Sequence, residues 1–342
     1  AVRSMAGAIR LAAGVVEGSR AALSRAITLV ESSLPDDFAR ATELFVELTR
    51  QQARRPTAHA LRVGITGPPG AGKSTFIEAL GRQLLDGGKR LAVLAVDPSS
   101  ATSGGSILGD KTRMHALACH PSAFVRPSPS SGALGGVALR THDAALLCEA
   151  AGFDHVLFET VGVGQSEVEV ANMVDMTVVL LPPGSGDGLQ AIKRGLIEHA
   201  DLIVVTKADG ELRAPAAALA REYATAMSML RRRWRGWRTP VLTCSSHSPA
   251  DVRAVLGCVR DFHATALRSG RFEQNRSEQE LRLLFSAVQG ELAFRLRTDA
   301  RINALIREQH RRIVGGEVAP RVAADCLSTL FVERMRGGQS AQ

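Results

Sequence analysis

The sequence predicts an α/β fold in which helices cover both faces of a mostly parallel sheet. Two observations lead to this prediction. Short apolar runs alternate with helical segments between residues 61 and 265, as in parallel sheets whose strands are joined by crossover helices. Outside that stretch only helical spacing is found. The chain of 342 residues therefore divides into an N-terminal helical extension (1–60), a central domain (61–265) and a C-terminal helical arm (266–342).

The N-terminal extension has the apolar spacing of helices over residues 8–52. The sequence Pro35-Asp36-Asp37 interrupts that spacing and predicts the start of a second helix. Residues 53–60 are expected to form a linker. The apolar runs of the central domain predict strands at 62–66, 91–96, 124–126, 155–159, 176–181, 202–205 and 241–244.

The C-terminal arm is predicted to be helical over residues 276–335. An apolar stripe runs along its first part at Leu281, Leu284, Phe285 and Val288. Such a stripe is typical of core packing, and the alternative is a helix that forms a dimer. The sequence alone leaves both interpretations open.

Composition limits the classes of partner. No apolar run approaches the roughly 20 residues that span a bilayer, so we expect no membrane partner. Five cysteines without a C-x-x-C pair indicate a reducing compartment and argue against a structural metal site. The net charge of +8 and the mixture of arginine and tryptophan at 231–237 could indicate nucleic acid. No nucleic-acid-binding motif surrounds that segment, so we expect a solvated loop and no nucleic-acid partner.

The loop after the first strand matches the pattern G-x-x-x-x-G-K-[ST] in full, between a strand and a helix. In this pattern backbone N–H groups and the helix N-terminus hold the phosphates of a nucleotide, a lysine neutralises the β- and γ-phosphates, and a hydroxyl binds Mg²⁺. The predicted nucleotide-binding residues here are Gly67, Pro68, Pro69, Gly70, Ala71, Gly72, Lys73, Ser74 and Thr75.

A second motif follows the strand at 202–205. Thr206-Lys207-Ala208-Asp209 resembles the N-K-x-D sequence with which GTPases read guanine. The Asp209 carboxylate would accept from the two N–H donors of guanine, which adenine lacks, and the stem of Lys207 would pack on the base. Thr206 stands where Asn is commoner. Ser245 and Ser246, after the last strand, fit the loop whose backbone N–H reads guanine O6.

Three carboxylates follow strands of the same sheet. Asp97, Asp110 and Glu159 lie in loops at the carboxyl ends of strands, where α/β folds bind their ligands. Oxygen ligands of this kind suit Mg²⁺, so we predict a Mg²⁺ site formed by these acids with Ser74. Gly162 could present its N–H group to the γ-phosphate, and its loop would then respond to hydrolysis.

These residues resemble the G-protein chaperones of adenosylcobalamin-dependent methylmalonyl-CoA mutase, a family that includes the bacterial MeaB proteins and the animal mitochondrial MMAA protein. Some members were formerly labelled ArgK or LAO/AO transport ATPases. The similarity runs from about residue 8 to residue 335. It is most specific in the blocks at 67–75, 94–100, 103–114, 126–132, 134–137 and 159–167.

The resemblance implies a P-loop NTPase G domain of the SIMIBI class between the N-terminal extension and a C-terminal dimerisation arm. It implies that Lys73 serves phosphate and that the acids above serve Mg²⁺. Residues 186–194 match a third switch loop that senses the mutase, although the family usually has Glu at the position of Gly188. The implied partners are the mutase and a second copy of the chain, and adenosylcobalamin is reached only through the mutase.

We therefore expect a slow, Mg²⁺-dependent GTPase that gates loading of adenosylcobalamin and protects or reactivates the mutase. No arginine finger is evident in the sequence, so Gln165 and Lys193 are the candidates that join Lys73 and Glu159 in catalysis once the partner orders the switches. Thr206 and the segment Leu181-Pro182-Pro183 resemble the animal form, which favours the mitochondrial matrix over a bacterial cytoplasm. The alternatives are a nickel metallochaperone GTPase and an ATP-dependent kinase or transport ATPase.

Overall fold

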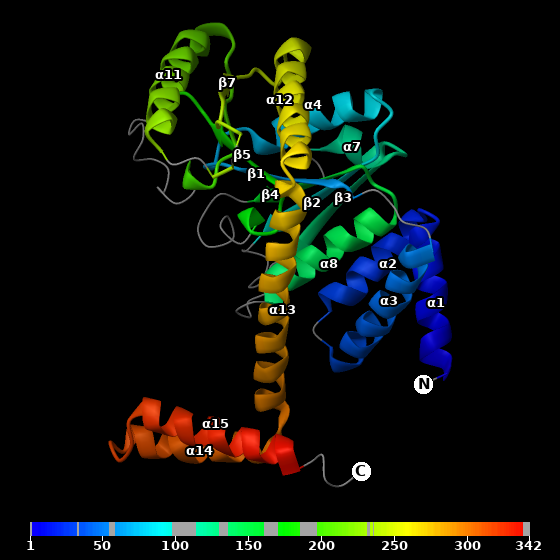
Figure 1. The fold of residues 1–342 in the computed structure, drawn as a ribbon, viewed down its shortest axis with the longest axis vertical. Coiled ribbons are helices and arrows are strands. Elements are labelled where there is room, and N and C mark those ends of the chain that lie inside the picture. The colour runs from blue at the N-terminus through cyan, green and yellow to red at the C-terminus, as the bar shows by residue number, and fades with distance from the viewer. Residues whose placement is uncertain are drawn as a thin grey trace. The chain divides into compact units, whose positions relative to one another are not determined.

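A computed structural model describes residues 2–32, 34–54, 59–97, 114–129, 136–160, 170–184, 197–230, 233–234 and 236–337. Seven strands of this part of the chain form one sheet in the order β3-β2-β4-β1-β5-β6-β7, and every neighbouring pair is parallel (Figure 1). They are β1 (Leu61–Thr66), β2 (Leu91–Asp97), β3 (Ala123–Pro129), β4 (His155–Thr160), β5 (Met176–Leu181), β6 (Leu202–Val205) and β7 (Val241–Thr243). All seven predicted strands and the parallel sheet are confirmed.

The helices before and within the central domain are α1 (Val2–Val16), α2 (Arg20–Glu31), α3 (Pro35–Arg54), α4 (Lys73–Asp86), α7 (His115–Cys119), α8 (Gly136–Ala150), α11 (Arg213–Met229) and α12 (Pro249–Arg268). The last three are α13 (Arg271–Thr298), α14 (Ala300–Val314) and α15 (Pro320–Gly337), as predicted for a purely helical C-terminal part.

The N-terminal extension contains one more helix than predicted. Pro35 begins α3 as expected, with Asp36 and Asp37 in its first turn. The preceding apolar run, however, is divided at Gly18, whose φ of 78° lies in the left-handed region. Ser19 then caps α2 by accepting a hydrogen bond from the Ala22 N–H at 3.4 Å. The spacing of apolar residues could not show this break, because the residues before and after Gly18 keep nearly the same helical spacing.

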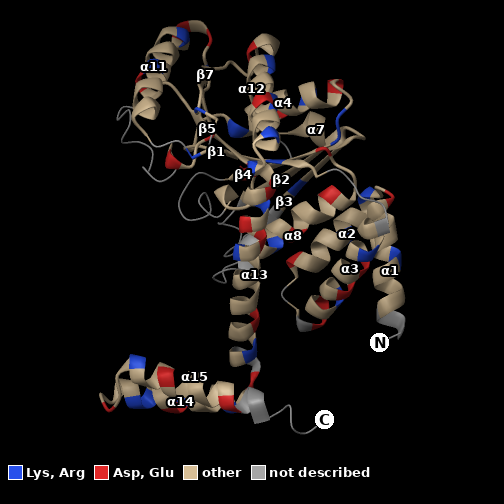
Figure 2. Cartoon of the chain, in the orientation of Figure 1, with Lys and Arg blue, Asp and Glu red and all other residues tan. Residues whose placement is uncertain are grey.

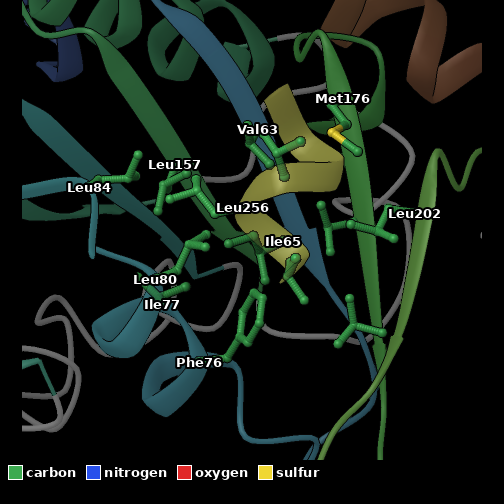
Figure 3. Packing of buried hydrophobic residues seen from close by; sticks show 14 of the residues in the cluster. Val63, Ile65, Phe76, Ile77, Leu80, Leu84, Leu157, Met176, Leu202 and Leu256 are labelled. Carbon is green, nitrogen blue, oxygen red and sulfur yellow. The ribbon is translucent and has the colours of Figure 1, made fainter. Parts of the chain in front are cut away.

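Side chains of the strands alternate between the two faces of the sheet, and each face has its own core. On one face Val63, Ile65 and Leu157 pack against Phe76 and Leu80 of α4, as Figure 3 shows, and α7 and α12 extend this cluster. The other face is covered by α8 together with α1, α2 and α3. Helix α11 packs over β5 and β6 on that face as well. The N-terminal helices therefore share a core with the sheet.

A buried cluster of charges joins α13, α8 and β1 to the loop that precedes β5. Arg276 of α13 binds Asp175 through two contacts of 2.5 and 2.7 Å and reaches Glu149 of α8 at 3.1 Å. Arg62 of β1 lies 2.6 Å from the same glutamate. Burial opposes ionisation of Glu149, but the two guanidinium groups outweigh it and lower the pKa of the carboxyl. This cluster fastens the start of α13 to the sheet.

The segment at 231–237 was predicted to be a solvated loop, but its described residues pack against the rest of the domain. Trp234 is buried, and its indole N–H donates to Asp201 at 2.7 Å. Arg233 binds the same carboxylate at 3.0 Å, and both Trp234 and Trp237 lie edge-on to Phe262. Arg233, Trp234 and Trp237 therefore hold α12 against the start of β6.

Packing separates residues 1–281 from residues 282–342. In the second unit α14 packs against α15. The predicted stripe on α13 is exposed, with 60% of Leu284 and 63% of Phe285 accessible, so core packing within the chain is the wrong interpretation of it.

Acidic and basic residues are interspersed along α3 and α13 (Figure 2). None of the described helices is long and apolar enough to cross a membrane.

Candidate nucleotide-binding site

The predicted site residues follow β1, β4, β6 and β7, which run in parallel and end at one edge of the sheet. Because β4 and β6 lie close on either side of β1, the loops after these strands meet around the loop at 67–72. This edge contains the start of α4, and the site is built on it.

The loop at 67–72 requires its glycines. Gly67 has a φ of 151°, and a Cβ atom there would lie 2.2 Å from the Leu180 carbonyl oxygen. Gly70 and Gly72 are left-handed, at 79° and 82°. Gly72 is also the N-cap of α4 and has no capping side chain, so the first N–H groups of the helix stay available to an anion.

Lys73 is folded over the loop it follows. Its ammonium donates to the carbonyl oxygens of Gly67 at 2.7 Å and Pro68 at 3.2 Å. These contacts hold the positive charge in the concave side of the loop, where the phosphate chain of a nucleotide would lie. The predicted role of Lys73 is consistent with this position.

Two of the predicted Mg²⁺ ligands are in contact. The Ser74 hydroxyl donates to Oε1 of Glu159 at 2.7 Å, and Glu159 is only 7% exposed at the end of β4. A hydroxyl and a carboxylate beside a phosphate-binding loop are hard oxygen donors of the kind Mg²⁺ prefers, so the pair fits this ion. Asp97 ends β2, but its side chain lies outside the described residues, as do Asp110, Gly162, Gln165 and Lys193.

Thr206 has a role that the sequence analysis did not foresee. Its side chain is buried, and its hydroxyl donates to the carbonyl oxygen of Ala71 at 2.8 Å and lies 3.2 Å from that of Leu181. The residue therefore ties the loop after β6 directly to the phosphate-binding loop. Lys207, which follows, has a φ of 54°, rare for a residue with a side chain, and this turn directs the chain toward Asp209.

Asp209 and Ser245 lie in contact, because the Ser245 hydroxyl donates to Oδ2 of Asp209. The Ser245 backbone N–H donates to Asp251 at 2.9 Å, and Ser248 caps α12 by accepting from the Asp251 N–H at 3.3 Å. Asp251 thus shapes the loop, although it was not among the predicted site residues. The spacing S-x-x-D from Ser248 to Asp251 was the signal that could have identified it.

A cavity of about 530 Å³ adjoins this loop and the start of α4. Its lining includes Thr75 and Ser246, two of the predicted nucleotide-binding residues, together with Glu78, Arg82 and His247. The cavity therefore touches the predicted site at Thr75 and Ser246, and most of its remaining lining lies along α4 and at the start of α12.

Comparison with known proteins gives the family. Residues 23–301 match the family described as methylmalonyl Co-A mutase-associated GTPase MeaB. The chain belongs to this family of P-loop GTPases.

Individual relatives cover nearly the whole chain. It is 47% identical to the mitochondrial methylmalonic aciduria type A homolog of Mus musculus, over 95% of this chain and 80% of that protein. It is 44% identical to GTPase ArgK of Escherichia coli, over 91% and 93%. The crystal structure of a protein named LAO/AO transport system kinase is 37% identical, superposes with a TM-score of 0.71, and covers 96% of this chain and 98% of that one.

Proposed function

We propose that this chain is a Mg²⁺-dependent GTPase that acts as a chaperone of adenosylcobalamin-dependent methylmalonyl-CoA mutase. It would gate the loading of the cofactor into the mutase and protect or reactivate that enzyme. The nucleotide part is supported by the position of the loops after β1, β4, β6 and β7 at one edge of the sheet, with the Ser74–Glu159 contact and the Asp209–Ser245 contact among them. The family match supports the mutase as partner.

Different residues of the chain would bind the phosphates and the Mg²⁺ ion. The N–H groups of the loop at 67–72 and of the first turn of α4 bind the β- and γ-phosphates, and Lys73 neutralises them. Ser74 and Glu159 would hold Mg²⁺, with Asp97 and Asp110 completing the acidic group. The ion supplies charge neutralisation of the phosphates when it is bound.

Guanine selectivity would come from Asp209, whose exposed carboxylate can accept both the N1–H and the 2-amino group of the base. The loop that carries it is held in place by Thr206 on one side and Ser245 on the other. Thr206 thus supplies the tether and Asp209 the base contact, so the absence of Asn at position 206 need not weaken selectivity.

The variant Asp209→Asn tests this assignment. An amide offers one acceptor and one donor, which match the N1–H and the 2-carbonyl of xanthine but not the two donors of guanine. We expect D209N to lose affinity for GDP by at least about tenfold and to gain affinity for XDP, because one polar contact is left unmatched. Asp261→Asn, an exposed aspartate on α12, is the matched control and should change neither.

Titration of the unmodified protein with GDP and ADP decides between the GTPase and the ATP-dependent alternative. Tighter binding of ADP than of GDP would contradict the role given to Asp209. It would favour instead a kinase or transport ATPase, as the name of the structurally related LAO/AO transport system kinase suggests.

Hydrolysis is proposed to be slow in the isolated chain and faster with the mutase bound. The loops that carry Gly162 and Gln165 and the switch that carries Lys193 would be ordered by that partner, so that the group facing the γ-phosphate is complete only in the complex. The homodimer and the mitochondrial matrix belong to the same proposal. The first is supported by the exposed stripe on α13 and the second by the mitochondrial relative of Mus musculus. The alternative is a bacterial cytoplasm, since other relatives are bacterial proteins.

A further inference from the structure

A second cavity lies at the opposite edge of the sheet from the nucleotide site. It has a volume of about 560 Å³ and contains the first residues of β1 and β4, Leu61 and His155. The phosphate-binding loop follows the last residue of β1, so the length of the strand places the two sites about 16 Å apart at least. The cavity therefore lies at the other end of β1 from the phosphate-binding loop, although Gln83 of α4 lines both this cavity and the one that Thr75 and Ser246 line. Its size is that of a site for a small molecule.

The base of this cavity is apolar and its rim is cationic. Leu61 of β1, Leu84 of α4, Leu256 of α12 and Phe153 of the loop before β4 are each less than 9% exposed and line it. The exposed side chains at the rim include Lys89 and Arg260. An apolar base with charge at one end is complementary to an amphipathic ligand, because the ligand buries its apolar body and keeps its charged group near water.

One of the cationic side chains at the rim has no acidic partner among the described residues. Asp154, the carboxylate in the lining, is already engaged: it accepts from Lys89 at 3.3 Å and from the Arg90 N–H at 2.7 Å. Arg260 makes no ion pair with any side chain in the described part of the chain. The guanidinium group is therefore available to an anion, and its planar fork suits a carboxylate, sulfonate or phosphate.

Two histidines add polar but uncharged groups to the wall. Burial is the main cause that lowers the pKa of His155, to about 4, and it also lowers the pKa of His263, so both rings are neutral near pH 7. Nδ1 of His155 is fully buried and has no hydrogen-bond partner among the described residues. An unpartnered lone pair costs less than an unpartnered N–H, so the proton is expected on Nε2, where it is a donor.

We propose that this cavity binds a small amphipathic monoanion, a molecule with a flat apolar body and one carboxylate, sulfonate or phosphate group. The apolar body would lie on Leu84, Phe153 and Leu256, and the anionic group would pair with Arg260 at the rim. The site is distinct from the phosphate-binding loop, which follows the opposite end of β1.

Anilinonaphthalene sulfonate is a suitable probe, because it has an aromatic body and one sulfonate. Its fluorescence would be titrated against the full chain, the variant Arg260→Glu and the variant Arg253→Glu. Arg253 lies two turns earlier on α12, is exposed and is absent from the cavity lining, so the two variants change the net charge of the same helix equally. Both side chains are on the surface, so neither change should disturb folding.

The expected result is saturable binding of one probe molecule to the cavity, weakened about tenfold by R260E and unchanged by R253E. Phenylnaphthylamine, which has the same body without the sulfonate, should bind with an affinity that R260E leaves unchanged. If the titration shows a second saturable phase of probe binding, and the variant Phe285→Glu lacks it, that phase belongs to the exposed stripe on α13 and is subtracted from the signal. Absence of a phase sensitive to R260E, or equal weakening by the two arginine variants, would overturn the proposal.

Discussion

The contact between Thr206 and the phosphate-binding loop makes a sharp prediction about nucleotide affinity. Thr206→Val replaces the hydroxyl by a methyl group of nearly the same volume and so removes the 2.8 Å bond to the Ala71 carbonyl without leaving a hole. The Leu181 carbonyl keeps its bond from the Thr206 backbone N–H at 2.8 Å. The variant therefore removes one donor to the loop and little else.

The magnitude follows from the burial of this contact. Thr206 is 2% exposed, so water cannot readily replace the lost donor. Removing one partner of a buried hydrogen bond costs about 1–3 kcal/mol. If the whole cost falls on the nucleotide-bound form of the loop, the dissociation constant for GDP rises by about 5-fold to about 150-fold.

The assay is titration of a fluorescent GDP analogue, with urea unfolding measured in parallel to separate the loss of affinity from any loss of stability. Thr177→Val is the matched control, because Thr177 is also buried but its hydroxyl has no hydrogen-bond partner among the described residues. Thr206→Ser should restore most of the affinity. Equal affinities of T206V and T177V would refute the tether.

Three further predictions concern stability and assembly. Arg276→Met leaves Asp175 as a buried unpaired charge and should lower the free energy of unfolding by about 3–5 kcal/mol in urea, and a change below about 1 kcal/mol would contradict the role of the cluster. Burial and the nearby guanidinium groups lower the pKa of His142 to about 3, below its usual 6.5. The contribution of the neutral His142 to the free energy of unfolding is therefore complete above pH 6.5 and is lost as the pH falls toward 3. His142→Gln should reduce that slope by up to about 1.4 kcal/mol per pH unit, and an unchanged slope would show that this histidine does not titrate differently on unfolding. Phe285→Glu should convert the proposed dimer to a monomer in light scattering, whereas an oligomeric state equal to that of the unmodified chain would remove the stripe from the interface.

The sheet could be predicted from the sequence because its strands are buried on both faces and appear as continuous apolar runs, such as those at 91–96 and 176–181. The ends of the N-terminal helices could not, because the left-handed turn at Gly18 leaves the apolar spacing almost unbroken. The role of Trp234 was missed for a different reason. Its partner, Asp201, is 33 residues away, and no local pattern records such a contact.

Part of the site could be predicted because its residues belong to short local motifs at the ends of strands. The phosphate-binding loop and the pair Asp209–Ser245 follow local motifs, and parallel strands bring such motifs together at one edge. The tether from Thr206 to Ala71 was not predictable, because it joins two motifs and the sequence shows only that Thr replaces Asn. The cluster that Arg276 forms with Asp175, Glu149 and Arg62 depends on side chains that are far apart in the chain, and it has no sequence signature.

The central claim is that this chain is a GTPase whose activity is completed by methylmalonyl-CoA mutase. The most direct test is the single-turnover rate of GTP hydrolysis by the full chain, measured with and without the mutase at saturating GTP and Mg²⁺. Hydrolysis should be slow for the chain alone and should clearly increase when the mutase is added. An equal rate in the two conditions, with binding of the mutase verified in the same samples, would contradict it.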